Sequence, residues 1–222
     1  TVFKFKDEKI DLTNNKMIVN DFAIEDENGN RITADGNATF EELTNPVFDL
    51  NFKAKNFQLL NSTAEDNDLY FGKLAFDASA ELTGNLNLPK LNLDLTIKDE
   101  SDLTYLVPTS QASIEERDGV VVFVNKEDPD NIMTQQADDA LNAKISGIDL
   151  NSNIKIEKQS KVKVVIDKRT NDNISIQGGG DFKFDMDRSG KMDLVGKYEV
   201  TTGSVELNLY NLVKRKFEIS PK

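Results

Sequence analysis

The segment of this chain that most resembles a ligand site is Asp185-Met186-Asp187-Arg188-Ser189-Gly190. It places side-chain oxygens at the first, third and fifth positions and a glycine at the sixth, as the start of a calcium-binding loop does. The twelfth position of such a loop holds a bidentate glutamate, but here it is Gly196. The segment also lies between two stretches with strand periodicity. We therefore expect a hairpin turn and no metal site.

Catalytic chemistry is restricted by what the chain lacks. The sequence contains no His and no Cys, which removes the commonest general base, the thiolate nucleophile and the commonest transition-metal ligands. Serines are frequent, but the chain has no His to act as their general base. Carboxylate pairs of the glycosidase kind are compatible with the 39 acidic residues, although solvent-facing side chains on strands are the simpler interpretation. We predict that the protein is not an enzyme, has no catalytic residue and uses no cofactor.

The charge balance limits the possible partners. The net charge is -12 and the pI is near 4.6, which argues against nucleic acid and against tight docking on an anionic membrane. Two short basic clusters depart from this balance, and either can contact a phosphate headgroup or form a solvated, charged sheet edge. The first contains Lys161, Lys163, Lys168 and Arg169 around Asp167, and the second is Lys214-Arg215-Lys216.

Alternation of apolar and polar residues is the dominant pattern of the chain. A period of two places every apolar side chain of a strand on one face and every polar side chain on the other. Pro46 and Pro89 stand at the starts of two such segments, where a missing N–H does least damage. Four segments carry the pattern most clearly: Phe48, Leu50, Phe52 and Ala54; Leu74, Phe76, Ala78, Ala80 and Leu82; Leu91, Leu93, Leu95 and Ile97; and Phe182, Phe184 and Met186.

Turn residues separate these segments. Glu27-Asn28-Gly29-Asn30 lies between two alternating stretches and predicts a hairpin. Gly178-Gly179-Gly180 precedes no helix, so it indicates a bend in a sheet rather than a phosphate-binding loop. Residues 125–143 are irregular, and we expect a loop there with a short helix over about residues 134–142. No run of about 18 apolar residues that spans a bilayer is present.

Periodicity alone leaves two architectures open. In a sandwich, two sheets share their apolar sides as a common core, and this is the simpler interpretation of the alternation. In the other architecture, one curved sheet folds partly over itself and leaves an apolar trough. Strands longer than the usual five or six residues favour a tall, twisted sheet.

The C-terminal third carries a more specific likeness. Gly196-Lys-Tyr198-Glu-Val200-Thr-Thr-Gly203-Ser204-Val-Glu-Leu207, followed by Lys216-Phe217-Glu-Ile219, resembles the closing region of the TamB family of the translocation and assembly module. Gly84-Asn-Leu-Asn-Leu-Pro89 resembles the Gly-x-Leu-x-x-Pro strand pairs of that family. Thr104-Tyr105-Leu-Val-Pro108, with Val120-Val-Val-Phe123-Val124, resembles a further section. The likeness covers about residues 70–222, and the Trp-x-Gly-Asp-Pro segment of the family lies beyond it.

The resemblance implies a fold and a location. Members of this AsmA-like group have an elongated, curved antiparallel or mixed β-sheet (a β-taco or β-roll) with an apolar interior groove. They extend through the periplasm of Gram-negative bacteria from an N-terminal helix in the inner membrane. We expect residues 1–222 to be a single β-rich unit, a piece of such a longer protein without its anchor.

The resemblance also implies a function. The groove is expected to carry phospholipid acyl chains between the two membranes and, with a BamA-like outer-membrane partner, to support outer-membrane biogenesis. Two alternatives stay open: the protein holds unfolded outer-membrane strands as a chaperone does, or it is an unrelated sandwich module of an adhesin or binding protein. The residues expected to line the groove are Phe48, Leu50, Phe52, Leu74, Phe76, Leu91, Leu93, Leu95, Ile97, Phe182, Phe184 and Met186.

Overall fold

A computed structural model describes residues 1–5, 9–41, 44–108, 147–209 and 213–219 of the chain, and in this part every regular element is a β-strand. The predicted all-β class is therefore confirmed. The predicted loop at 125–143, its short helix and the Val120–Val124 motif lie outside the described residues. The strands are β1 (Lys4–Phe5), β2 (Ile10–Thr13), β3 (Lys16–Glu25), β4 (Arg31–Thr39), β5 (Val47–Ser62), β6 (Tyr70–Asn85), β7 (Leu88–Ile97), β8 (Asp102–Leu106), β9 (Asp149–Ile156), β10 (Lys161–Asp167), β11 (Asp172–Met186), β12 (Met192–Leu209) and β13 (Val213–Ile219).

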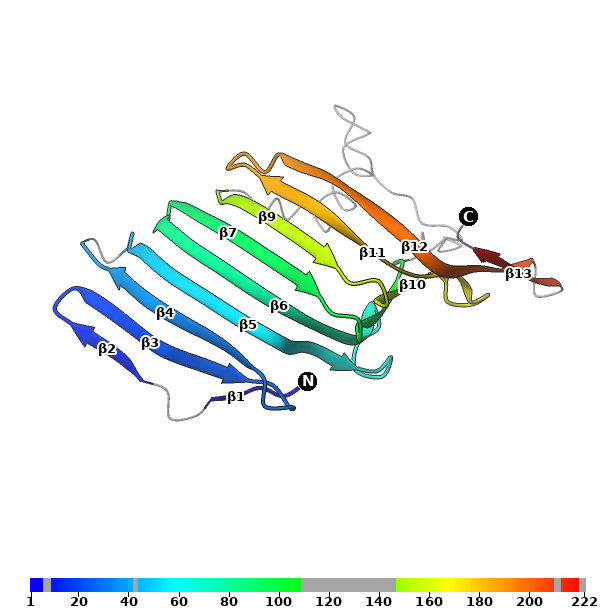
Figure 1. Ribbon diagram of the computed structural model, residues 1–222, viewed down its shortest axis with the longest axis horizontal. Helices are drawn as coiled ribbons and strands as arrows, with labels where there is room; N and C mark the ends of the chain where they lie inside the picture. The colour runs from blue at the N-terminus through cyan, green and yellow to red at the C-terminus, as the bar shows by residue number, and fades with distance from the viewer. Residues whose placement is uncertain (6–8, 42–43, 109–146, 210–212, 220–222) are drawn as a thin grey trace, which may run out of the picture.

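All these strands join in one mixed sheet (Figure 1). From one edge to the other, the strands follow the order β3-β4-β5-β6-β7-β9-β11-β12. At one edge β1 and β2 pair with opposite ends of β3, and at the other edge β13 pairs with β12. Among the described strand pairs, only β7–β9 and β8–β10 are parallel.

Four short strands fill the space between β6 and β11. β7 pairs with one half of β6 and β8 pairs with the other half, so together they form one interrupted strand. β9 and β10 pair in the same way with the two halves of β11. The two interruptions, residues 98–101 and 157–160, therefore lie side by side in the middle of the sheet.

The local turn chemistry matches the sequence. The carboxylate of Asp26 accepts hydrogen bonds from the backbone N–H groups of Asn28 and Asn30, which closes the predicted hairpin between β3 and β4. Asp187 does the same for Ser189 and Lys191 between β11 and β12. The segment that resembles a calcium loop is therefore the predicted hairpin turn.

Two β-bulges keep the apolar side chains on one face where the sequence breaks its period of two. Apolar residues stand three positions apart at Ala54 and Phe57, and the bulge between them contains Asn56 with a positive φ of 49°. Its backbone N–H donates to Asp77 of β6 over 2.7 Å. An equivalent bulge in β3 contains Asp21, whose φ is 48° and whose N–H donates to Asp35 over 2.8 Å. Each bulge accommodates one extra residue, so the apolar side chains after it return to the apolar face.

The packing is that of a single layer. Few side chains of the described part are fully buried, and Phe57 is the largest apolar one at 1% exposure. Because all the described strands belong to one sheet, no second sheet packs against it within that part. The sandwich favoured by periodicity alone is therefore wrong for the described residues. The physical reason is that alternation specifies which side chains share a face, but does not specify what covers them.

Candidate functional site: the apolar face of the sheet

The apolar side chains of neighbouring strands are in register, so they form rows across the sheet. Residues directly opposite each other in a pair project to the same side. One row runs from β5 to β12, and the next two rows repeat it one pleat further along. The three rows are Leu50, Leu82, Leu91, Leu150, Met186 and Met192; Phe52, Ala80, Leu93, Ser152, Phe184 and Leu194; and Ala54, Ala78, Leu95, Ile154, Phe182 and Gly196.

This apolar face contains all twelve predicted groove residues. Met186 is buried and the other eleven are half-buried, because neighbours in the same layer shield their flanks while one side stays open. The strand register places these twelve side chains on the same face. Further members of the face were not among the predicted groove residues: Val19, Phe22 and Ala38 near one edge, and Phe57 beyond the bulge.

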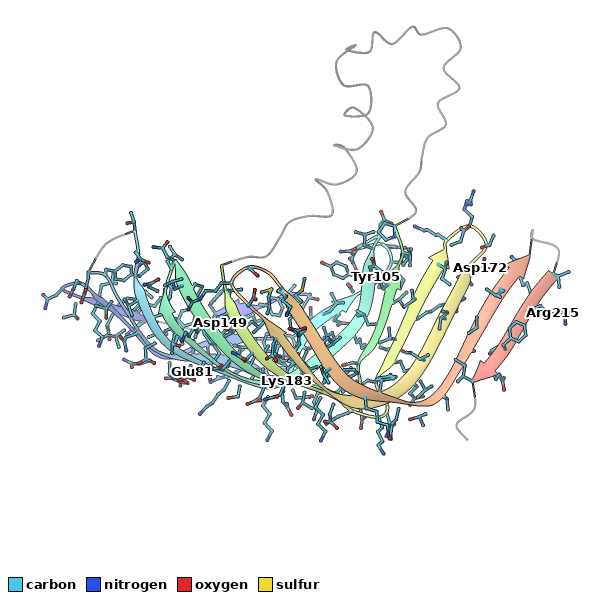
Figure 2. The ribbon with its side chains drawn as sticks, turned by 90° about the horizontal axis from the view of Figure 1, so that it is seen from above. Glu81, Tyr105, Asp149, Asp172, Lys183 and Arg215 are labelled. Carbon is cyan, nitrogen blue, oxygen red and sulfur yellow. The ribbon has the colours of Figure 1, made fainter. Side chains whose placement is uncertain are left out.

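The opposite face is polar. Along β5, β6 and β7 it presents Asp49, Asn51, Lys53, Glu81, Asn92 and Asp94, all exposed. Figure 2 shows the sheet strongly curved, with Glu81 and Lys183 at the bottom of the curve on its convex side. The apolar face is therefore the concave one.

Small residues explain why the sheet curves toward its apolar side. Gly36, Gly84 and Gly180 lie on this face, and a Cβ on any of them meets a backbone carbonyl of the adjacent strand. Along a row, small and large residues alternate, as in Phe52, Ala80, Leu93, Ser152 and Phe184. Less side-chain volume on one face lets the strands approach on that side.

Within the three rows described above, Ser152 is the polar exception. It stands between Leu93 and Phe184 in its row and is 3% exposed. Its Oγ is buried and has no hydrogen-bond partner among the described residues. A small residue fits between two large neighbours, so the burial of Ser152 follows from its size rather than from its polarity.

A charged cluster on the polar face joins the two interrupted strands. Lys98 Nζ lies 2.7 Å from Glu157 Oε1 and 3.3 Å from Asp77 Oδ2. The hydrogen bond that Lys98 donates to Glu157 and the interaction of Lys98 with Asp77 raise the pKa of Lys98, although partial burial opposes this. The hydrogen bond from Lys98 lowers the pKa of Glu157. At Asp77, burial is the largest influence and raises the pKa, but the hydrogen bonds from Asn56 and Lys98 outweigh it and leave the pKa lowered.

The described residues contain no group of three or more acidic side chains placed to hold a metal ion. None of their elements is a helix of the length and apolarity that cross a bilayer. The chemistry that these residues do provide is a wide apolar surface, backed by a charged one.

Comparison with known proteins agrees with this architecture. The family model of the TamB C-terminal domain matches residues 20–222. A search of curated proteins found no match, and neither did a search of solved structures. TamB proteins are components of the bacterial envelope and form a transport and assembly module, not a known enzyme family. Because the match covers nearly the whole chain, we conclude that the chain belongs to the TamB family and carries its C-terminal domain.

Proposed function

We propose that the apolar face of the sheet carries phospholipid acyl chains between the inner and outer membranes. In the full-length periplasmic protein, anchored in the inner membrane, this activity would support outer-membrane biogenesis together with a BamA-like partner. The observation that carries the proposal is the continuity of the apolar rows from β5 to β12, with no covering layer within the described part. Family membership supports a role in transport or assembly.

The energetics favour an acyl chain as the occupant. Each CH₂ group removed from water contributes about 0.8 kcal/mol, so an acyl chain gains only where the apolar surface is continuous. The rows present similar chemistry at each strand, for example Leu50, Leu82, Leu91 and Leu150. A chain that moves from one strand to the next therefore exchanges equivalent contacts, and its movement along the sheet is nearly neutral in free energy.

Site-specific photocrosslinking tests the proposal. A photoreactive amino acid at Leu95, on the apolar face, is expected to form lipid adducts in cells. The matched control is Asp94, which is the adjacent residue on the polar face and is exposed. Lipid adducts at both positions in equal yield, or at neither, contradict a lipid-bearing apolar face.

A charge placed on the face gives an independent test. Leu93→Arg puts a guanidinium between Ala80 and Ser152 and is expected to stop lipid flux in the full-length protein. Asn92→Arg adds the same charge to the polar face and should leave flux unchanged. The abundance of both variants is measured first, because the buried charge also lowers stability. Normal lipid flux in Leu93→Arg would show that this face is not the path.

A polypeptide client is the second candidate, and one observation favours it. β13 pairs with Gly203–Leu209 of β12, so within the described part the remainder of β12 pairs only with β11. This free edge carries the exposed side chains of Met192, Leu194 and Val195, and an extended strand can add to such an edge. Polypeptide adducts from Leu95, in place of lipid adducts, would select this candidate.

A further inference from the structure

The second basic cluster of the sequence lies at one end of the sheet, beside a turn from a different part of the chain. Lys214, Arg215 and Lys216 open β13 and pair with Asn208, Leu207 and Glu206 of β12. The turn between β10 and β11 lies next to the same end of β12, because the side chain of Asn208 donates to the carbonyl of Thr170 over 3.2 Å. A pocket there is lined by Thr170, Asn171, Glu206, Lys214, Arg215 and Lys216, among others.

The pocket has the charge of an anion site. Its lining contains three cations and one carboxylate, that of Glu206, in a chain whose net charge is -12. The three cations are exposed, and none of them forms an ion pair with another described residue. The Glu206 carboxylate accepts a hydrogen bond from Asn173 Nδ2 over 3.4 Å, so it is already engaged on the side away from β13.

Thr170 also lines this pocket, but its hydroxyl is enclosed. Thr170 Oγ1 is buried and has no partner among the described residues, although a buried hydroxyl without a partner is costly. Exposed Lys and Arg side chains without an ion-pair partner are the charged donors that a phosphate group uses. Arg215 projects toward the apolar face and Lys214 and Lys216 toward the polar face, so this end of the sheet presents cations on both faces.

We propose that Lys214, Arg215 and Lys216 bind the phosphate groups of anionic phospholipid headgroups. The proposal rests on the proposed function and extends it to the class of lipid. A lipid whose acyl chain lies on the apolar face keeps its headgroup outside that face, and this end of the sheet gives the headgroup matching charges. Because the whole chain is acidic, its general field repels an anionic lipid, and any preference for one must come from a local site.

Vesicle flotation with the whole 222-residue chain tests the proposal. Vesicles of phosphatidylcholine mixed with phosphatidylglycerol are expected to bind the chain more tightly than vesicles of phosphatidylcholine alone. Each cation near an anionic surface contributes roughly fivefold in affinity, so the triple variant K214Q/R215Q/K216Q should lose on the order of 100-fold.

The matched control is K53Q/K90Q/K155Q, which changes the net charge equally at three exposed lysines of the polar face. Apart from the loss that the change in net charge itself causes, this control should weaken vesicle binding by less than about twofold. An equal loss in both triple variants, or no loss in the cluster variant, overturns the site. Circular dichroism of both variants confirms that the sheet is intact.

Inorganic phosphate separates the two sources of the ligand. At constant ionic strength, it should displace the chain from anionic vesicles only weakly if the headgroup is the ligand. Saturation by free phosphate without any binding to the vesicles overturns the headgroup assignment. Crosslinking from Leu95 in the cluster variant separates this proposal from the proposed function. If the apolar face carries acyl chains, Leu95 should still form adducts with neutral lipid in this variant. Polypeptide adducts at Leu95 would refute the proposed function, whereas the vesicle experiment tests the headgroup site itself.

Discussion

Lys98 and Glu157 form a 2.7 Å ion pair and also occupy equivalent positions in two repeated segments that are 59 residues apart. Each segment has a strand, a four-residue turn ending in a buried serine, and a second strand; the serines are Ser101 and Ser160. The parallel register of β7 with β9 places Ile97 opposite Ile156, so the repeat in sequence is also the pairing in space. Opposite charges at equivalent positions therefore meet directly.

The first prediction concerns this ion pair. Lys98→Met removes the cation that lies between Asp77 and Glu157 and leaves two partly buried carboxylates close together. Because the side chains of Lys98 and Glu157 are 22% and 25% exposed, we expect a loss of about 1–2 kcal/mol, between the values for surface and buried pairs. Urea unfolding measures it, with Lys53→Met as the exposed control. A loss no larger than in the control would show that the cluster does not stabilise the sheet.

The second prediction concerns pH. The folded-state pKa values of Glu157 and Asp77 are below their ordinary values of 4.5 and 3.8, so their contribution is complete above pH 4.5 and is lost as pH falls. The pKa of Lys98 is raised above 10.5, so its contribution is complete below that pH and is lost above it. As the pH rises from about 3 to about 5, the free energy of unfolding of the wild type should therefore increase more than that of Lys98→Met. If the free energy of unfolding depended on pH in the same way in both proteins, the ion pair would not be the cause of the pH dependence.

The third prediction concerns the curvature of the sheet. Gly36 has a φ of +132° and its Cβ position meets the carbonyl of Asp49, whereas Gly29 has a φ of +84° and open space around it. Gly29→Ala carries only the backbone penalty, about 1 kcal/mol. Gly36→Ala adds a steric clash with β5, so we expect it to be the more destabilising change by at least about 1 kcal/mol in thermal or urea unfolding. Equal losses would show that the close approach of β4 and β5 does not depend on glycine.

The fourth prediction concerns Ser152. Ser152→Ala removes a buried hydroxyl without a partner and keeps the small volume between Leu93 and Phe184. The free energy of unfolding should therefore stay the same or rise by about 1 kcal/mol. Ser79→Ala, at an exposed position of the polar face, serves as the control and should change little. A clear loss in Ser152→Ala would show that the hydroxyl has a partner.

Local sequence patterns are enough to predict the strands, their faces and most of their turns. Period-two alternation fixes which of Leu91, Asn92 and Leu93 share a side, because strand geometry leaves no other choice. Asn28-Gly29 and Ser189-Gly190 mark turns through the backbone freedom of their residues. These are local constraints, so they can be predicted from neighbouring residues.

The tertiary structure decided how the strands are joined. No local rule predicts that β7 pairs with β9 in parallel, or that Lys98 meets Glu157, because such contacts depend on long-range pairing. The tertiary structure also places Phe57 on the apolar face, because a bulge adds one residue to the strand between Ala54 and Phe57. Above all, it decided between sandwich and single sheet: alternation makes an apolar face, but only the arrangement of the described strands shows that no second sheet covers it.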